Sequence, residues 1–226
     1  MLDPAAPRLL DVRRTVRYYA AGGEAAPEVW VVLHGYGQLA AYFLRPFRSL
    51  AGAGRRFLAP EAPSRFYLDD TYTRIGASWM TRESRETEIR DAVAYLDALV
   101  RREVGPNRGR VTLCGLGFSQ GASALARWAA LGSARLDRLV LWGGEVPADL
   151  DLAAHGARLA NLTLVAGDTD ALVTPERIGA VETRLREGGV PFTTVRYPGG
   201  HRIEADVLRS VVEGGVEEDR GRSVEA

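Results

Sequence analysis

Short apolar runs alternate with longer amphipathic segments along most of this chain. Near-continuous apolar runs bounded by glycine, proline or polar residues are typical of strands that are buried on both faces of a parallel sheet. The runs that we interpret as strands are 29–34, 56–61, 111–115, 139–143, 162–167 and 193–198. The shorter stretch 12–20 alternates apolar and polar residues, which favours an antiparallel strand at an edge of the sheet.

The segments between these runs have the spacing of helices that bury one face. The apolar residues of the first such segment are Ile89, Val93, Leu96 and Val100. The predicted helices are 82–104, 119–132, 174–187 and 203–213. Strands that alternate with helices predict an α/β fold, with a mostly parallel central sheet and helices on both faces.

The length of 226 residues fits one domain, and no segment reads as a linker between domains. Residues 1–8 are rich in proline and alanine, and we expect them to be loose. The charged segment 214–226 has almost no large apolar residues, which indicates a mobile tail. The predicted domain therefore has its core at about 9–213.

Composition excludes several classes of chemistry. The 29 basic residues balance the 29 acidic ones, and this gives no reason to expect nucleic acid as a partner. All the basic residues are arginine, so no lysine can serve as a Schiff base, a phosphate ligand or a catalytic base. The single cysteine, Cys114, excludes an internal disulfide, and no pattern supports a metal site. Without a signal-like or membrane-spanning run, we expect a soluble cytoplasmic protein with no stable membrane insertion.

The segment Gly117-Phe118-Ser119-Gln120-Gly121 follows a predicted strand and precedes a predicted helix. This G-x-S-x-G pattern in this context is typical of a nucleophile elbow, in which a sharp strained turn exposes the serine hydroxyl. The glycines leave room for the tight turn, and the helix N-terminus favours a developing oxyanion. The pattern therefore predicts Ser119 as a nucleophile.

Two other interpretations of this segment compete. Ser119 could simply cap the helix. Alternatively, Gly115, Gly117 and Gly121 form a variant of the dinucleotide-binding fingerprint. That fingerprint normally follows the first strand and needs an acidic residue at the end of the next one, where this chain has Trp142. The nucleophile is the better interpretation.

The chain has three histidines, which narrows the choice of a general base. His201 follows the last predicted strand and a Gly-Gly pair that lets the loop bend. His34 ends an early strand and is better placed to order a loop, and His155 reads as a surface residue. In α/β-hydrolases the order along the chain is serine, acid, histidine, which favours His201.

The acid that orients this histidine should lie between Ser119 and His201. Both Asp168 and Asp170 follow the strand 162–167 and are candidates. Both could also be turn residues ahead of a helix that begins at Thr174-Pro175. An orienting carboxylate would fix the imidazole tautomer and stabilise the imidazolium.

Two backbone N–H groups should complete the site. The loop His34-Gly35-Tyr36-Gly37 follows an early strand, as does the loop that supplies one oxyanion donor in this fold. We assign that donor to Tyr36 and the second to Gln120, the residue after the nucleophile. A simple glycine turn is the alternative for the first loop.

Together these motifs resemble the phospholipase/carboxylesterase family, small serine esterases of the α/β-hydrolase fold that include acyl-protein thioesterases. The matching strings are Leu33-His34-Gly35-Tyr36-Gly37, Ala59-Pro60-Glu61-Ala62-Pro63, Ser78-Trp79, Gly117-Phe118-Ser119-Gln120-Gly121, Gly167-Asp168-Thr169-Asp170-Ala171-Leu172-Val173 and Tyr197-Pro198-Gly199-Gly200-His201. The resemblance implies a triad of Ser119, Asp170 and His201. It also implies no cofactor, little or no lid, a small-molecule ester as partner and, as in many members, a homodimer.

The chain departs from the family at Ala122, Gln38, Met80 and Thr81 and has a short glycine loop before His201. The resemblance implies a serine carboxylesterase for small or medium-chain esters, with thioesters and lysophospholipids as further options. The alternative is a binding protein that keeps the fold without turnover. The residues that we expect to bind substrate are Phe66, Trp79, Met80, Trp142, Leu172 and Val173.

Overall fold

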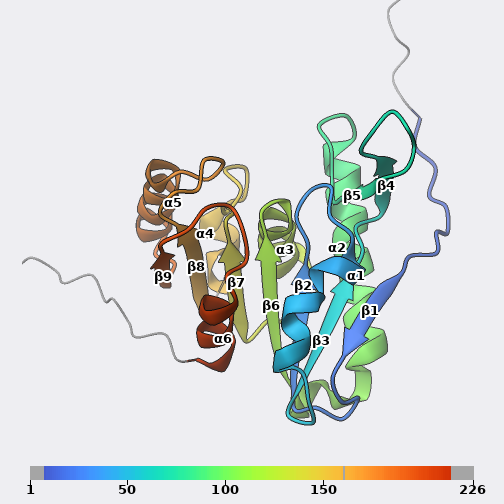
Figure 1. Cartoon of the computed structure of the whole chain (residues 1–226), viewed down its shortest axis with the longest axis horizontal. Coiled ribbons are helices and arrows are strands. Elements are labelled where there is room, and N and C mark those ends of the chain that lie inside the picture. The colour runs from blue at the N-terminus through green and yellow to red at the C-terminus, as the bar shows by residue number, and fades with distance from the viewer. Residues whose placement is uncertain (1–7, 160, 215–226) are drawn as a thin grey trace, which may run out of the picture.

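A seven-stranded sheet forms the centre of the computed structural model, which describes residues 8–159 and 161–214. Its strand order is β1-β3-β2-β6-β7-β8-β9. The bounds are β1 Tyr18–Ala21, β2 Glu28–Leu33, β3 Arg55–Pro60, β6 Thr112–Phe118, β7 Arg138–Trp142, β8 Leu162–Gly167 and β9 Phe192–Tyr197. All neighbours pair in parallel except β1, which pairs antiparallel with β3 (Figure 1).

The sheet confirms the predicted fold class and every predicted apolar strand. The predicted edge strand 12–20 is only partly correct, because β1 begins at Tyr18. Residues 8–15 are exposed and lie in no strand, so they bury no alternating face that would hold them against the sheet.

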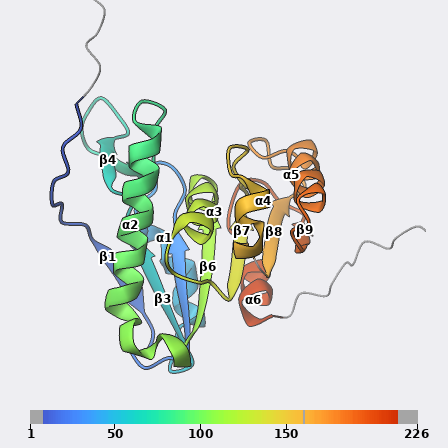
Figure 2. The same ribbon diagram turned by 180° about the vertical axis from the view of Figure 1, so that it is seen from behind.

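Helices cover both faces of the sheet, as predicted. The longer helices are α2 Arg85–Glu103, α3 Gln120–Leu131, α5 Pro175–Glu187 and α6 Ala205–Glu213. Figure 2 shows α2, α3 and α4 (Leu152–His155) in front of the sheet, whereas α1 (Ala40–Phe43) and α6 lie on the face seen in Figure 1. Each face has its own apolar cluster, so the central strands are buried on both sides.

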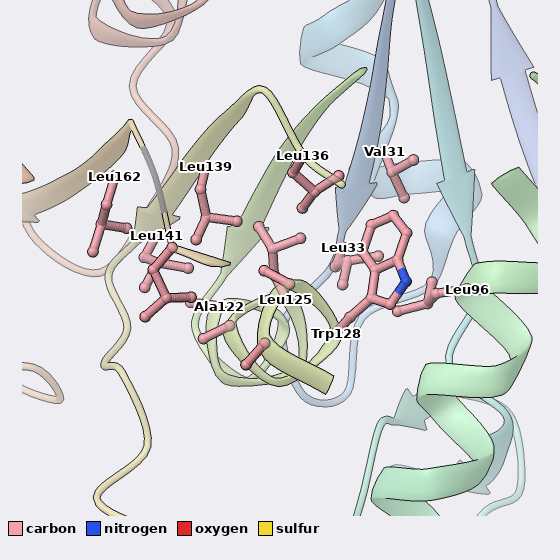
Figure 3. Close-up of a cluster of buried hydrophobic side chains, with 14 of the residues drawn as sticks. Val31, Leu33, Leu96, Ala122, Leu125, Trp128, Leu136, Leu139, Leu141 and Leu162 are labelled. Carbon is pink, nitrogen blue, oxygen red and sulfur yellow. The ribbon is translucent and has the colours of Figure 1, made fainter. Parts of the chain in front are cut away.

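Helix α3, which directly follows Ser119, is fixed by the larger of these clusters. Leu125 and Trp128 of α3 pack between strand residues such as Leu33 and Leu139 and the α2 residue Leu96, as Figure 3 shows. Trp128 is fully buried, and its indole N–H donates to Asp97 of α2 at 2.8 Å. Burial of large side chains at this junction holds the N-terminus of α3 at one place on the sheet.

Several short elements were not predicted. They are the 3-10 helices η1 Arg45–Leu50, η2 Gly105–Arg110 and η3 Gly156–Arg158, the helices α1 and α4, and the strands β4 Ser64–Tyr67 and β5 Ile75–Ser78. Strands β4 and β5 form an antiparallel hairpin outside the main sheet. Each has only four residues, which is too short for a periodic pattern to stand out.

The carboxyl ends of β2, β6, β7, β8 and β9 meet at one edge of the sheet, because these strands are parallel neighbours. Loops at this edge carry the residues that the sequence singles out, as expected for an open α/β sheet. The β4–β5 hairpin reaches the same edge, because Gly37 N–H, in the loop after β2, donates to the Ala77 carbonyl of β5 at 2.9 Å.

Candidate active site

Ser119 occupies a strained turn between β6 and α3. Its φ of 54° and ψ of −119° fall in a region that non-glycine residues rarely adopt. The turn is held by hydrogen bonds from Ser119 N–H to the Trp142 carbonyl and from Ala122 N–H to the Ser119 carbonyl, each 2.9 Å. This is the backbone conformation of a nucleophile elbow.

The glycines around Ser119 are required by close backbone packing. A Cβ on Gly117 would lie 2.3 Å from the carbonyl oxygen of Gly121. A Cβ on Gly121 would lie 2.3 Å from the carbonyl oxygen of Leu33, on the neighbouring strand β2. Contact between backbones therefore explains these two glycines without a nucleotide ligand.

His201 lies within hydrogen-bonding distance of the serine hydroxyl. Its Nε2 is 2.9 Å from Ser119 Oγ, and its ring packs on Phe118 with the centroids 4.8 Å apart. The loop that carries His201 is anchored to β7, because the buried Trp142 indole donates to the Arg202 carbonyl at 2.9 Å. The Tyr197 hydroxyl is also within hydrogen-bonding distance of the Arg202 carbonyl, at 2.6 Å, to which it can donate its one proton.

Asp170, and not Asp168, is the carboxylate that faces the imidazole. Asp170 Oδ2 is 2.7 Å from His201 Nδ1, while Asp168 is exposed and contributes a backbone hydrogen bond to β9. The other oxygen, Oδ1, accepts from the N–H groups of Leu172 at 2.8 Å and Val173 at 2.9 Å. Ser119, His201 and Asp170 thus form one hydrogen-bonded chain.

The hydrogen bonds keep Asp170 ionised even though its side chain is only 1% exposed. Burial is the largest influence on its pKa and would raise it. The donors Val173 N–H, His201 and Leu172 N–H together outweigh burial, so the pKa of Asp170 lies below its ordinary value of 3.8. An anion behind the ring is suited to stabilise an imidazolium.

The N–H groups of Tyr36 and Gln120 have no acceptor among residues 8–159 and 161–214. Tyr36 follows Gly35, which packs against Ser119: a Cβ on Gly35 would lie 3.2 Å from the Ser119 Cβ. Gln120 is the first residue of α3, where N–H groups have no partner within the helix. Tyr36 belongs to a loop that closes on itself, since Gln38 N–H donates to the Gly35 carbonyl and the Gln38 side chain accepts from Gly35 N–H at 2.8 Å.

His34 orders the loop that carries Tyr36, as its sequence position favours. Its Nε2 accepts from Ala62 N–H at 3.0 Å, so the ring proton is on Nδ1 and is donated to the Gly35 carbonyl at 2.8 Å. Burial is the main cause that lowers the pKa of His34. A neutral ring therefore fixes the Gly35–Tyr36 peptide group, whose N–H is that of Tyr36.

The Gln120 side chain connects α3 to the segment after β5. Its Oε1 accepts from Trp79 N–H at 3.0 Å and its Nε2 donates to the Met80 carbonyl at 2.9 Å. The Trp79 indole in turn donates to the His34 carbonyl at 2.8 Å. These bonds join α3, which begins with Gln120, to the loop that carries Tyr36 by way of the segment after β5.

A cavity of about 710 Å³ opens beside His201. Its lining is mainly apolar and includes Leu39, Tyr42, Phe43, Leu68, Ile75 and Ile203. Leu68 and Ile75 border the loop of the β4–β5 hairpin, which sequence patterns did not reveal. The signal in the sequence was the presence of large apolar residues in a segment without an assigned element. In the structure 39% of Leu68 and 44% of Ile75 remain exposed.

None of the six residues expected to bind substrate lines this cavity. Trp79 and Trp142 are at most 1% exposed and have hydrogen-bonded indoles, so both belong to the core, and their contact with substrate stays a prediction. Val173 is buried, and Met80 lies beside Arg127. Phe66 stacks on Tyr36 and Leu172 is 61% exposed, and contact of these two with substrate stays a prediction.

The remaining reactive side chains lie apart from this chain of three residues. His155 ends α4, and Cys114 is buried within β6, where burial raises the pKa of its thiol to about 12. Over residues 8–159 and 161–214, histidine, cysteine and acidic side chains form no group of three or more that could hold a metal. Within the same ranges, no helix is both long and apolar enough to cross a bilayer.

Solved structures of other proteins share the overall fold of this chain. No protein-family model matches the chain, and a search of curated proteins finds no significant match. Among solved structures, acyl-protein thioesterase 2 of Zea mays is 18% identical, with a TM-score of 0.69 over 88% of this chain and 96% of that one.

Bacterial carboxylesterases match similarly. The enzyme from Mesorhizobium loti is 21% identical, with a TM-score of 0.68 over 88% of this chain and 95% of that one. The Bacillus cereus carboxylesterase is 17% identical, with a TM-score of 0.67 over 88% and 92% of the two chains. These matches confirm the α/β-hydrolase fold and the expected resemblance in structure to carboxylesterases and acyl-protein thioesterases.

Proposed function

We propose that this protein is a serine carboxylesterase in which Ser119 is the nucleophile, His201 the general base and Asp170 the acid that orients the base. The observation that carries the proposal is the unbroken chain of hydrogen bonds from Ser119 Oγ to His201 Nε2 at 2.9 Å and from His201 Nδ1 to Asp170 at 2.7 Å. The strained backbone of Ser119, which presents the hydroxyl, supports it.

In this mechanism His201 removes the hydroxyl proton of Ser119 as the oxygen attacks the ester carbonyl carbon. The N–H groups of Tyr36 and Gln120 donate to the tetrahedral oxyanion. His201 then gives the proton to the leaving alcohol, and an acyl-enzyme remains. Water, deprotonated by His201, attacks the acyl-enzyme, and the acid and free Ser119 are released.

The apolar cavity beside His201 supports esters of small or medium-chain carboxylic acids as substrates. Its volume of about 710 Å³ is within the usual range for small-molecule sites. The same chemistry applies to thioesters and lysophospholipids, because each presents a carbonyl carbon with a leaving group. The names of the similar solved structures, a thioesterase and carboxylesterases, do not decide among these substrates.

Hydrolysis of p-nitrophenyl esters of graded chain length tests the proposal. The wild type should hydrolyse acetyl to octanoyl esters, whereas Ser119→Ala should fall to the background rate. A Ser123→Ala variant serves as a control, because Ser123 lies one turn further along α3 and its hydroxyl donates to the Glu145 carbonyl instead. Equal background rates in the wild type and Ser119→Ala would leave a binding protein without turnover as the better proposal.

A further inference from the structure

A charged side chain lies beside the proposed acid and has no part in the mechanism above. Arg177 is in the first turn of α5. Its guanidinium donates to both carboxylate oxygens of Glu145. The two bonds run from Nε at 2.6 Å and from one terminal nitrogen at 3.1 Å. The other terminal nitrogen donates to the Leu172 carbonyl at 2.7 Å.

That carbonyl belongs to the peptide group that joins Leu172 to Val173. The N–H at the other end of the same group donates to Asp170 Oδ1 at 2.9 Å. A cation that binds the carbonyl oxygen polarises the peptide group and makes its N–H a stronger donor. Arg177 is therefore one peptide group away from the proposed catalytic carboxylate.

The partner of Arg177 belongs to the loop that touches the rest of the triad. Glu145 follows Gly143 and Gly144, and a Cβ on these glycines would lie 3.2 Å from His201 Nδ1 and 2.8 Å from the Ser119 carbonyl oxygen. The Glu145 carbonyl also accepts from Ser123 of α3 at 3.3 Å. The ion pair thus connects the loop beside Ser119 and His201 with the loop that holds Asp170.

We propose that Arg177, held by Glu145, is a positioning residue for Asp170, and this inference rests on the proposed function of the triad. Its side chain is 56% exposed and that of Glu145 29%, so the pair adds little to overall stability. The two-point geometry and the third bond instead fix the direction of the Leu172–Val173 peptide group. Substitution of Arg177 or Glu145 should therefore affect catalysis more than folding.

The test compares Arg177→Ala, Arg177→Lys and Glu145→Gln with Arg186→Ala. Arg186 is the matched control, since it is on the same helix, 62% exposed, and paired with Glu182. We expect Arg177→Ala to lower kcat roughly tenfold with KM little changed, because small misplacement of a catalytic group is costly. Arg177→Lys should keep only part of the wild-type kcat, because a lysine cannot bond both to the Glu145 carboxylate and to the Leu172 carbonyl in this way. Thermal midpoints of Arg177→Ala and Arg186→Ala should agree.

A double-mutant cycle tests whether Arg177 acts through Asp170. The rate at which a fluorophosphonate modifies Ser119 should fall about tenfold for Arg177→Ala in the wild-type background. It should not fall further when Arg177→Ala is added to Asp170→Asn. The same tenfold loss in both backgrounds, or a loss no larger than that of Arg186→Ala, would overturn the inference. A wild type that does not react at all would instead refute the proposed function.

Discussion

At the residue scale, the site combines one strained residue with side chains held by ordinary hydrogen bonds. The conformation of Ser119 costs on the order of 1–3 kcal/mol and persists because the surrounding structure determines it. His34 and Asp170 each bind a backbone peptide group that lies at the site. Orientation of these groups therefore comes from the backbone as much as from other side chains.

The two aspartates after β8 should differ strongly in importance. Asp170→Asn removes the anion behind His201 and leaves an amide that favours the wrong tautomer, so kcat should fall by about 10⁴. Asp168→Asn changes an exposed side chain and should keep kcat within about twofold of the wild type. Steady-state kinetics with one p-nitrophenyl ester check both values. A larger loss for Asp168→Asn would reassign the orienting role.

A pH effect on stability is expected from Asp149. Its hydrogen bond with Arg85 is the first cause, supported by Arg127, that lowers the pKa of Asp149 from 3.8 to about 2. Because the folded-state pKa is depressed, the stabilisation is complete above pH 3.8 and is lost as the pH falls toward 2. Asp149→Asn should thus destabilise the protein at pH 6 and have a smaller effect at pH 3.

Urea unfolding midpoints at the two pH values measure this difference. Asp151→Asn is a useful comparison, because Asp151 caps α4 through backbone N–H groups and pairs with no arginine in the part of the chain that the structure describes. A difference for Asp149→Asn that stays the same or grows between pH 6 and pH 3 would contradict the assignment.

At the element scale, the long elements and the strained turn at Ser119 were predictable because their signals are local. Helix α3 was expected at 119–132 and lies at 120–131, since its apolar spacing and the glycine pattern occur within one stretch of sequence. The β4–β5 hairpin was missed because Ile75-Gly76-Ala77-Ser78 has one large apolar residue. Gly76 is required there by contact with Gly37, which no local pattern reveals.

The loop 35–38 should depend on the side chain of Gln38. Its Oε1 accepts from Gly35 N–H at 2.8 Å and thereby shapes the turn that presents Tyr36 N–H. Gln38→Ala should lower kcat about tenfold, less than the 10²–10³ expected for loss of a whole oxyanion donor. Gln38→Glu keeps the acceptor and should retain most of the activity. Steady-state kinetics of both variants check this, and equal losses would show that the bond is unimportant.

At the scale of the whole molecule, the sheet brings together residues from distant parts of the chain. That the side chains of Ser119, Asp170 and His201 lie close together was predictable, because each follows a strand that ends at the same edge. The walls of the cavity were not, because an aromatic residue after a strand fits the core as well as a pocket. Trp142 illustrates this, as its indole is buried against Tyr197. The single-domain organisation, cytoplasmic location and homodimer stay predictions.

The cavity beside His201 should limit the length of the acyl chain that the protein accepts. Ile75→Trp adds volume at its wall and should shift the preferred p-nitrophenyl ester toward shorter chains, with acetyl hydrolysis kept within about threefold. Leu131→Trp is the control, because Leu131 is similarly exposed at the end of α3 and does not line this cavity. An unchanged chain-length profile for Ile75→Trp would place the acyl chain elsewhere.

Covalent labelling of the nucleophile tests the proposed chemistry most directly. The wild-type protein is treated with a fluorophosphonate probe, digested, and analysed by peptide mass spectrometry. One adduct should form on Ser119, and His201→Ala should react far more slowly, while Ser119→Ala should not react. An unlabelled wild type, or an adduct that forms on another residue and survives Ser119→Ala, would contradict catalysis by this serine.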